Sequence, residues 1–227
     1  MARPDSSSSI SWNLFLDLTH LYKAGIQQLA HRNLFRRVGI NGHHIHALSA
    51  YPLALAAWEA FLNETCMSTP AQIDYPNSLL WDLMKQAENW SIEDKTILVP
   101  KLLLGNTFNE SKQPYQDFKI LVSIRNHIIH FRPEDAPVKK LRHLAERKIT
   151  LIPPDDARYS WSLQLQSTEG VRWAINTIAK MVSGLTVMFP KGNWPGNSLA
   201  FNSISETEAE EMFRAENLDP DIEDNPT

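Results

Sequence analysis

The stretch YQDFKILVSIRNHIIHFRP, residues 115–133, decides the fold. Pro114 stands just before it, where a proline gives up no needed N–H, and Pro133 ends it because the residue before a proline avoids helical dihedral angles. Placed at 100° per residue, its apolar side chains cover more than half of the circumference. They are Phe118, Ile120, Leu121, Val122, Ile124, Ile128, Ile129 and Phe131. So broad a stripe predicts a long central helix that is packed on several sides.

The polar residues of this helix form a narrow strip, which consists of Lys119, Ser123, Asn126, His127 and His130. Asn126 and His130 are four positions apart and are therefore neighbours on the strip. Arg125 points instead into the apolar sector. A guanidinium cannot lose its charge, so a buried one needs a carboxylate or a bound anion. The pattern therefore predicts either an anion site or a structural ion pair.

A second helix is predicted at residues 45–65, where the sequence is apolar nearly all round and therefore internal. Glu59 is its one charged residue between Ile45 and Leu62, histidine aside. An inward carboxylate and the inward Arg125 are natural partners. Two interpretations remain open, a buried structural salt bridge and a carboxylate that orients Arg125 for a ligand.

Helices are also predicted at residues 11–38, 79–87, 91–104 and 167–189. Ser91 starts a capping box, Gly105 ends the helix that follows, and Ser167 caps the last one. That last helix repeats apolar residues at alternating spacings of four and three, as bundle helices do: Val171, Ile175, Ile178, Val182 and Leu185. Residues 149–166 leave room for a small β-hairpin.

These elements predict an all-α fold, a bundle of about five to seven helices in one domain over residues 1–190. Residues 191–227 are expected to form a linker and an acidic, disordered tail. Residues 205–227 carry nine acidic residues and one basic residue, or −8, whereas residues 1–204 carry 21 Lys and Arg against 17 Asp and Glu, or +4. A basic body with an acidic tail is compatible with a nucleic-acid partner and also with a merely solubilising tail.

The most basic stretch, PVKKLRHLAERK, directly follows the predicted central helix. The candidate nucleic-acid contacts are Lys119, Lys139, Lys140, Arg142 and Arg147. Lys and Arg supply most nonspecific affinity for phosphate backbones, although a basic helix is often only a solvated face.

No metal site or cofactor is expected. His43, His44 and His46 are close in sequence and imidazoles bind zinc or nickel, but no cysteine or acidic cluster accompanies them. The single Cys66 excludes an internal disulfide and fits a reducing compartment. No apolar run reaches the ~18 residues of a membrane span, and residues 1–10 lack a signal-peptide core. A soluble cytoplasmic protein without a membrane partner is expected.

The motif RNHIIH, residues 125–130, resembles the HEPN superfamily of all-α domains. That family carries an arginine, four to six residues and then a histidine, often with a polar residue directly after the arginine. Here these are Arg125, Asn126 and His130, and the resemblance covers roughly residues 45–189. A subgroup paired with nucleotidyltransferases has a tyrosine two residues after the histidine, and Arg132 at that place argues against membership in it.

The resemblance implies a metal-independent endoribonuclease, as in toxins and phage-defence effectors, that acts on RNA as a homodimer with a composite site at the interface. An antitoxin or regulatory protein is an implied partner. His130 would move protons and Arg125 would hold the phosphate, since a guanidinium offers a bidentate fork. Asn126 would orient His130 or hold a phosphate oxygen, and His127 and Glu59 would be auxiliary.

The alternative is a noncatalytic helical module that binds a protein partner or a nucleotide. The two hypotheses differ in geometry. In the enzyme, Arg125 and His130 should meet at a place that solvent reaches, whereas in the module Arg125 should be sealed against Glu59.

Overall fold

The computed structural model describes residues 9–31, 44–68, 79–130, 137–150, 161–189 and 201–217. Its elements are α1 (Ile10–His31), α3 (Ala47–Ser68), α5 (Leu79–Gln86), the 3-10 turn η2 (Ala87–Asn89), α6 (Ile92–Leu104), α7 (Tyr115–Ile129), α8 (Val138–Glu146), α9 (Trp161–Gln164), α10 (Thr168–Met188) and α11 (Glu206–Asn217). The predicted all-α fold is confirmed.

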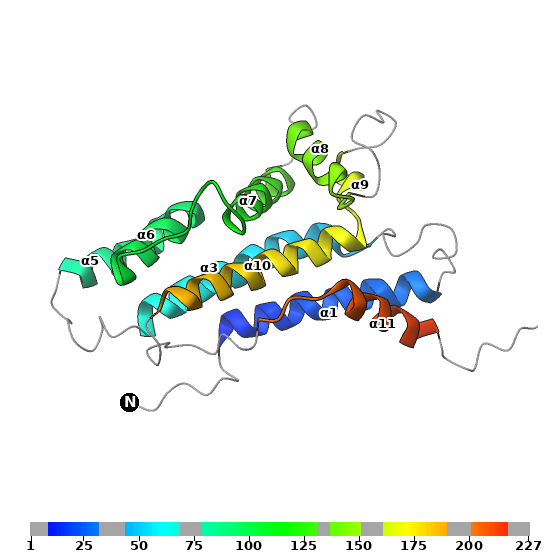
Figure 1. Ribbon diagram of the computed structural model, residues 1–227, viewed down its shortest axis with the longest axis horizontal. Coiled ribbons are helices and arrows are strands. Elements are labelled where there is room, and N and C mark those ends of the chain that lie inside the picture. Colours follow the sequence, from blue (N-terminus) through cyan, green and yellow to red (C-terminus); the bar gives the residue numbers. More distant parts are fainter. Residues whose placement is uncertain are drawn as a thin grey trace, which may run out of the picture.

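Helix α3 is the centre of the bundle. In Figure 1, α10 runs in front of α3 and α1 runs along both, and these three long helices all contact one another. Helices α6 and α7 also pack on α3. Its inward side chains are almost completely buried: Ala50, Tyr51, Ala54, Ala57, Trp58 and Leu62. The expectation of an internal helix here is confirmed. The expectation that residues 115–133 form the central helix is wrong, because α7 lies across α3 and α10 at one side and ends at Ile129.

Aromatic rings fill the space between α3 and α7. The Trp58 ring contacts the rings of Phe61, Phe108 and Phe118, with centroids 5.8 to 6.3 Å apart. The indole Nε1–H of Trp58 donates a hydrogen bond to Thr96 Oγ1 of α6 over 2.8 Å. A buried indole usually finds such a partner, and this one fixes α6 against α3.

The helix boundaries follow the capping signals in the sequence. The Ser91 hydroxyl accepts from the backbone N–H of Asp94, and the Ser167 hydroxyl accepts from that of Gly170. Gly105 ends α6 in the left-handed region, at φ 68°, which glycine adopts without steric cost. Helix α1 ends at His31 within the described residues, and the rest of the helix predicted to residue 38 lies outside them.

Two predictions about the later part of the chain are wrong. The second arm of the expected hairpin is helical, since Trp161–Gln164 forms α9, and residues 151–160 lie outside the described residues. Residues 201–217 are not a disordered tail. Phe201, Ile204 and Ala209 are buried, and Glu206–Asn217 forms α11 on the surface of α1. Residues 190–200 and 218–227 lie outside the description.

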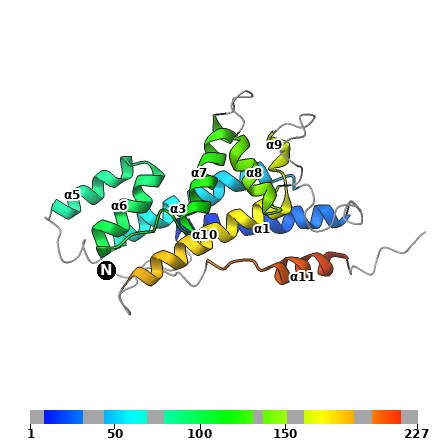
Figure 2. The ribbon, with the colours of Figure 1, turned by 45° about the horizontal axis from the view of Figure 1, so that its top comes forward.

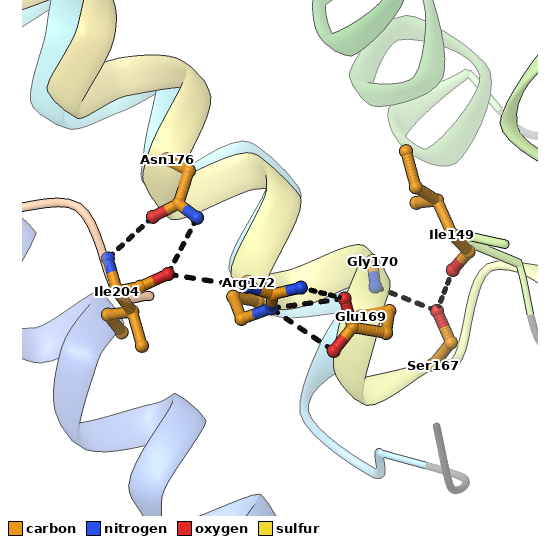
Figure 3. A network of polar contacts seen from close by, with 7 residues as sticks. All are labelled: Ile149, Ser167, Glu169, Gly170, Arg172, Asn176 and Ile204. Carbon is orange, nitrogen blue, oxygen red and sulfur yellow. Dashed lines mark hydrogen bonds and ion pairs between the residues drawn. The ribbon is translucent and has the colours of Figure 1, made fainter. Parts of the chain in front are cut away.

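The C-terminal segment, residues 201–217, is held by polar contacts from α10 (Figure 3). The Asn176 side chain donates to the carbonyl of Ile204 over 2.8 Å and accepts from its N–H over 2.7 Å. Arg172, which pairs with Glu169 over 2.6 Å, donates to the same carbonyl. The ring of Phe201 contacts those of Phe15 and Phe61, with centroids 4.7 and 5.2 Å away. This segment therefore completes the core on the α1 side.

Helix α11 lies on α1, on the far side of the α3–α10 layer from α7 and α8 (Figures 1 and 2). Its carboxylates are thus separated from the basic helix α8 by the core of the bundle. The acidic residues of α11 do not cover that basic surface.

Candidate functional site

The Glu59 carboxylate does not pair with Arg125. Its partner is Lys95 of α6, whose Nζ lies 2.6 Å from Glu59 Oε1. The Lys95 side chain is 2% exposed, whereas that of Glu59 is 40% exposed. The lysine stem therefore crosses the apolar interior and delivers its ammonium to a carboxylate at the edge of the core. The predicted auxiliary role of Glu59 toward Arg125 is wrong.

Arg125 lies just before the last turn of α7 and is only half-buried. Figure 2 shows α7 rising away from α3 and α10 toward this end, where a side chain in its apolar sector reaches solvent. The Arg125 Nη1–H donates a hydrogen bond to Asn126 Oδ1 over 3.0 Å. Among the described residues the guanidinium has no ion-pair partner. It keeps further donors for an anion, because a guanidinium carries five N–H groups.

His130 and Asn126 lie together at the end of the polar strip. His130 is the C-cap of α7, and its backbone N–H donates to the Asn126 carbonyl over 2.9 Å. Both side chains are exposed. The structure therefore places Arg125, Asn126 and His130 within the last six residues of α7 and its C-cap, with a side-chain hydrogen bond between Arg125 and Asn126. That these three residues act together stays a prediction. Residues 131–136, which follow directly, lie outside the described residues.

His127 is the most constrained residue of the strip. Its Nδ1 lies 2.6 Å from the backbone carbonyl oxygen of Ser123, and its ring meets that of Trp161 edge to face at a centroid distance of 6.2 Å. The side chain is half-buried. Trp161 belongs to α9, a helix that the sequence analysis did not predict, and it covers one side of His127.

Helix α8 packs beside the strip and brings a lysine onto it. The Lys140 ammonium donates to the Ser123 hydroxyl, and the side chain is half-buried. Burial lowers the pKa of the Lys140 amine, and the charge of Lys119 lowers it further against the opposing charge of Glu93. Of the two charges, that of Glu93 acts more strongly on the Lys140 amine than that of Lys119.

The other basic residues of α8 differ in their surroundings. Lys139 and Arg142 are exposed. Arg147 forms a bidentate ion pair with Asp117 in the first turn of α7, with contacts of 2.5 and 3.0 Å. Burial alone raises the pKa of the Asp117 carboxyl, but the hydrogen bonds and charge of Arg147 outweigh it and hold the pKa below its usual range. Arg147 therefore fixes α8 to α7, and its contact with nucleic acid stays a prediction.

Sequence reasoning missed three contacts of this region, which are Lys95 with Glu59, Asp117 with Arg147, and Lys140 with Ser123. The second could have been found, because Asp117 falls in the apolar sector of α7 by the same arithmetic that singles out Arg125. The other two depend on how α6 and α8 pack, which no local pattern encodes.

Within the described ranges, no cluster of three or more His, Cys, Asp or Glu side chains could hold a metal ion. His43 of the histidine-rich loop lies outside them, while His44 is buried and its ring stacks on Tyr22 at a centroid distance of 6.2 Å. None of the described helices is both long and apolar enough to cross a bilayer. Comparison with protein-family models, with curated proteins and with solved structures finds no match to this chain.

Proposed function

We propose that this chain is a metal-independent endoribonuclease of the HEPN type, a toxin or phage-defence effector, with Arg125, Asn126 and His130 in its active site. The observation that carries the proposal is the position of Arg125. Arg125 lies beside Asn126 near the helix end that bears His130. The carboxylate of Glu59 forms its ion pair with Lys95 instead. An Arg125 that solvent reaches and that does not pair with Glu59 supports the enzyme over the binding module.

The residue types suit RNA cleavage through the neighbouring 2′-hydroxyl. This reaction needs a cation for the charge that develops on the phosphate, and the Arg125 guanidinium offers a planar fork of donors. It also needs a group that moves a proton near neutral pH, and histidine is suited to that. The side-chain amide oxygen of Asn126 accepts a hydrogen bond from the Arg125 guanidinium.

A homodimer is part of the proposal. Ile129 at the end of α7 and Val138 at the start of α8 are 48% and 44% exposed, although both are large and apolar. Apolar side chains beside the motif suit burial against a second copy of the chain. Lys119 and Lys140 would hold the flanking phosphates of the RNA.

The test is cleavage of total RNA in excess EDTA by the wild type, Arg125→Gln, His130→Ala and a control, His143→Ala. His143 is an exposed histidine of α8 and is not part of the strip. We expect the wild type and the control to cut at equal rates and to leave 2′,3′-cyclic phosphate ends. We expect losses of about 10²- to 10⁴-fold for the histidine variant and 10²- to 10³-fold for the arginine variant. A folded, dimeric wild type that cuts none of these RNAs would instead favour the noncatalytic module.

A further inference from the structure

We infer that His127 is a second catalytic histidine, which accepts the proton of the attacking 2′-hydroxyl while His130 of the same chain donates a proton to the leaving 5′-oxygen. This inference rests on the proposed function. It adds that each chain carries both proton-transfer groups, on one helix face, rather than a single histidine that depends on its counterpart across a dimer.

A hydrogen bond fixes the tautomer of the His127 ring. Its Nδ1 lies 2.6 Å from the Ser123 carbonyl oxygen, and a carbonyl oxygen can only accept. The neutral ring must therefore carry its proton on Nδ1, which leaves a lone pair on Nε2. A neutral imidazole whose second nitrogen is fixed by a backbone carbonyl is an oriented base.

The packing around His127 also holds the ring in place. The Trp161 ring meets the imidazole edge to face, with centroids 6.2 Å apart, so the ring is held by a contact as well as by the hydrogen bond. The Ser123 hydroxyl is engaged by the Lys140 ammonium, which places a cation one helical turn before His127 on the same strip. The imidazole is therefore held by a backbone carbonyl and an aromatic ring, with a cation nearby on the same strip.

The spacing of His127 and His130 also suits two proton transfers at one phosphate. His127 and His130 are three positions apart, and side chains with that spacing are neighbours on one helix face, with about 5–6 Å between their Cβ atoms. Cleavage of RNA through its 2′-hydroxyl needs one group on each side of the phosphorus, because the attacking and leaving oxygens are in line. Two adjacent imidazoles can serve the two oxygens of one phosphate.

The proposed cleavage step involves two proton transfers, one bond formed and one bond broken. The 2′-oxygen forms a bond to phosphorus as its proton passes to Nε2 of His127. The bond from phosphorus to the 5′-oxygen breaks, and that oxygen takes a proton from a protonated His130. The products are a 2′,3′-cyclic phosphate and a free 5′-hydroxyl, and Arg125 stabilises the charge on the phosphate oxygens between these events.

The test compares His127→Gln, His130→Ala and the control His143→Ala on two forms of one RNA, with an ordinary or a sulfur-substituted 5′ leaving atom. A thiolate needs no proton to leave, because thiols are far more acidic than alcohols. We expect both strip variants to lose about 10²- to 10⁴-fold on the ordinary RNA. On the sulfur-substituted RNA, we expect the rate of His130→Ala to return to that of wild type, while His127→Gln stays slow.

Mixing the two strip variants tests whether the pair acts within one chain. If His127 worked with His130 of a second copy, mixed dimers would regain one complete site, or about a quarter of the activity overall. We expect no recovery. The NMR signals of the His127 ring nitrogens give a readout independent of cleavage, and we expect the neutral ring to carry its proton on Nδ1.

Each outcome decides one of the two proposals. If the wild type cuts and His127→Gln cuts equally well, or if the proton is found on Nε2, this inference is wrong and the proposed function stands. Recovery in the mixture would also overturn the assignment to one chain. If the wild type cuts neither RNA, the proposed function fails and this inference fails with it.

Discussion

Replacing Arg147 with methionine removes the guanidinium that neutralises Asp117, and the cost can be estimated from the exposure of the two side chains. Asp117 is 10% exposed and Arg147 is 35% exposed. Breaking a fully buried pair costs about 3–5 kcal/mol, and an exposed pair contributes about 0.2–1 kcal/mol. The half-open geometry lies between these limits. We therefore expect the free energy of unfolding at pH 7 to fall by about 2–3 kcal/mol.

For a chain of this size such a loss corresponds to a fall of about 4–12 °C in the midpoint of thermal unfolding. The dependence on pH has a definite sign. The pKa of Asp117 is depressed in the folded state, so the pair stabilises the fold fully above the ordinary pKa of aspartate, about 3.9, and this contribution is lost as the pH falls through the folded value. The difference between wild type and Arg147→Met should therefore shrink below about pH 4.

The assay is urea unfolding followed by circular dichroism, for Arg147→Met, Asp117→Asn and the double variant. We expect the double variant to lose less than the sum of the single variants, with a coupling of about 1–3 kcal/mol. The control is Lys139→Met, an exposed basic residue on the same helix. If Arg147→Met unfolds within about 0.5 kcal/mol of the wild type at pH 7, the pair is no stronger than a surface contact and the reasoning is refuted.

Three other outcomes are expected. Gly25→Ala should lower the free energy of unfolding by about 1–3 kcal/mol in the same urea assay, because its Cβ would lie 2.0 Å from Nε2 of the buried His44; an alanine variant as stable as the wild type would contradict this packing. Asn176→Ala should remove both hydrogen bonds to the Ile204 backbone and speed amide exchange in residues 201–217, with α7 unchanged as the internal control; equal exchange there in both proteins would count against the clamp. Lys140→Gln should weaken RNA binding and flatten the plot of log affinity against log salt by about 0.7, measured with a noncleavable single strand; an unaltered slope would remove this lysine from the phosphate contacts.

Local patterns in the sequence predicted the helices well. Hydrophobic periodicity located α3, α7 and α10, and the capping serines Ser91 and Ser167 gave the starts of α6 and α10, because these signals act within a few residues. Helix α11 was missed although a signal was present. Ser205 and Glu208 form a reciprocal capping box, with contacts of 2.7 and 3.1 Å, but the acidic composition of the segment outweighed it in the interpretation.

The candidate site was predictable only in part. The order of residues placed Asn126, His127 and His130 on one strip, since helical spacing fixes which side chains are neighbours. The partners of Arg125 and Glu59 were not predictable in this way. Helical periodicity gives the direction of a side chain around the helix axis, but it does not tell which parts of a helix its neighbours cover. It also cannot show that Lys95 crosses the interior to reach Glu59.

The contact between Phe201 and Phe15 has a consequence for synthesis of the chain. Helix α1 is made first, yet the ring of Phe201, which packs on Phe15 and Trp12, follows more than 180 residues later. On a ribosome, the aromatic side chains of α1 therefore stay incompletely covered until almost the whole domain has emerged. Contacts of such long sequence separation form late. Chains released before residue 201 would expose apolar side chains of α1 to chaperones and to one another.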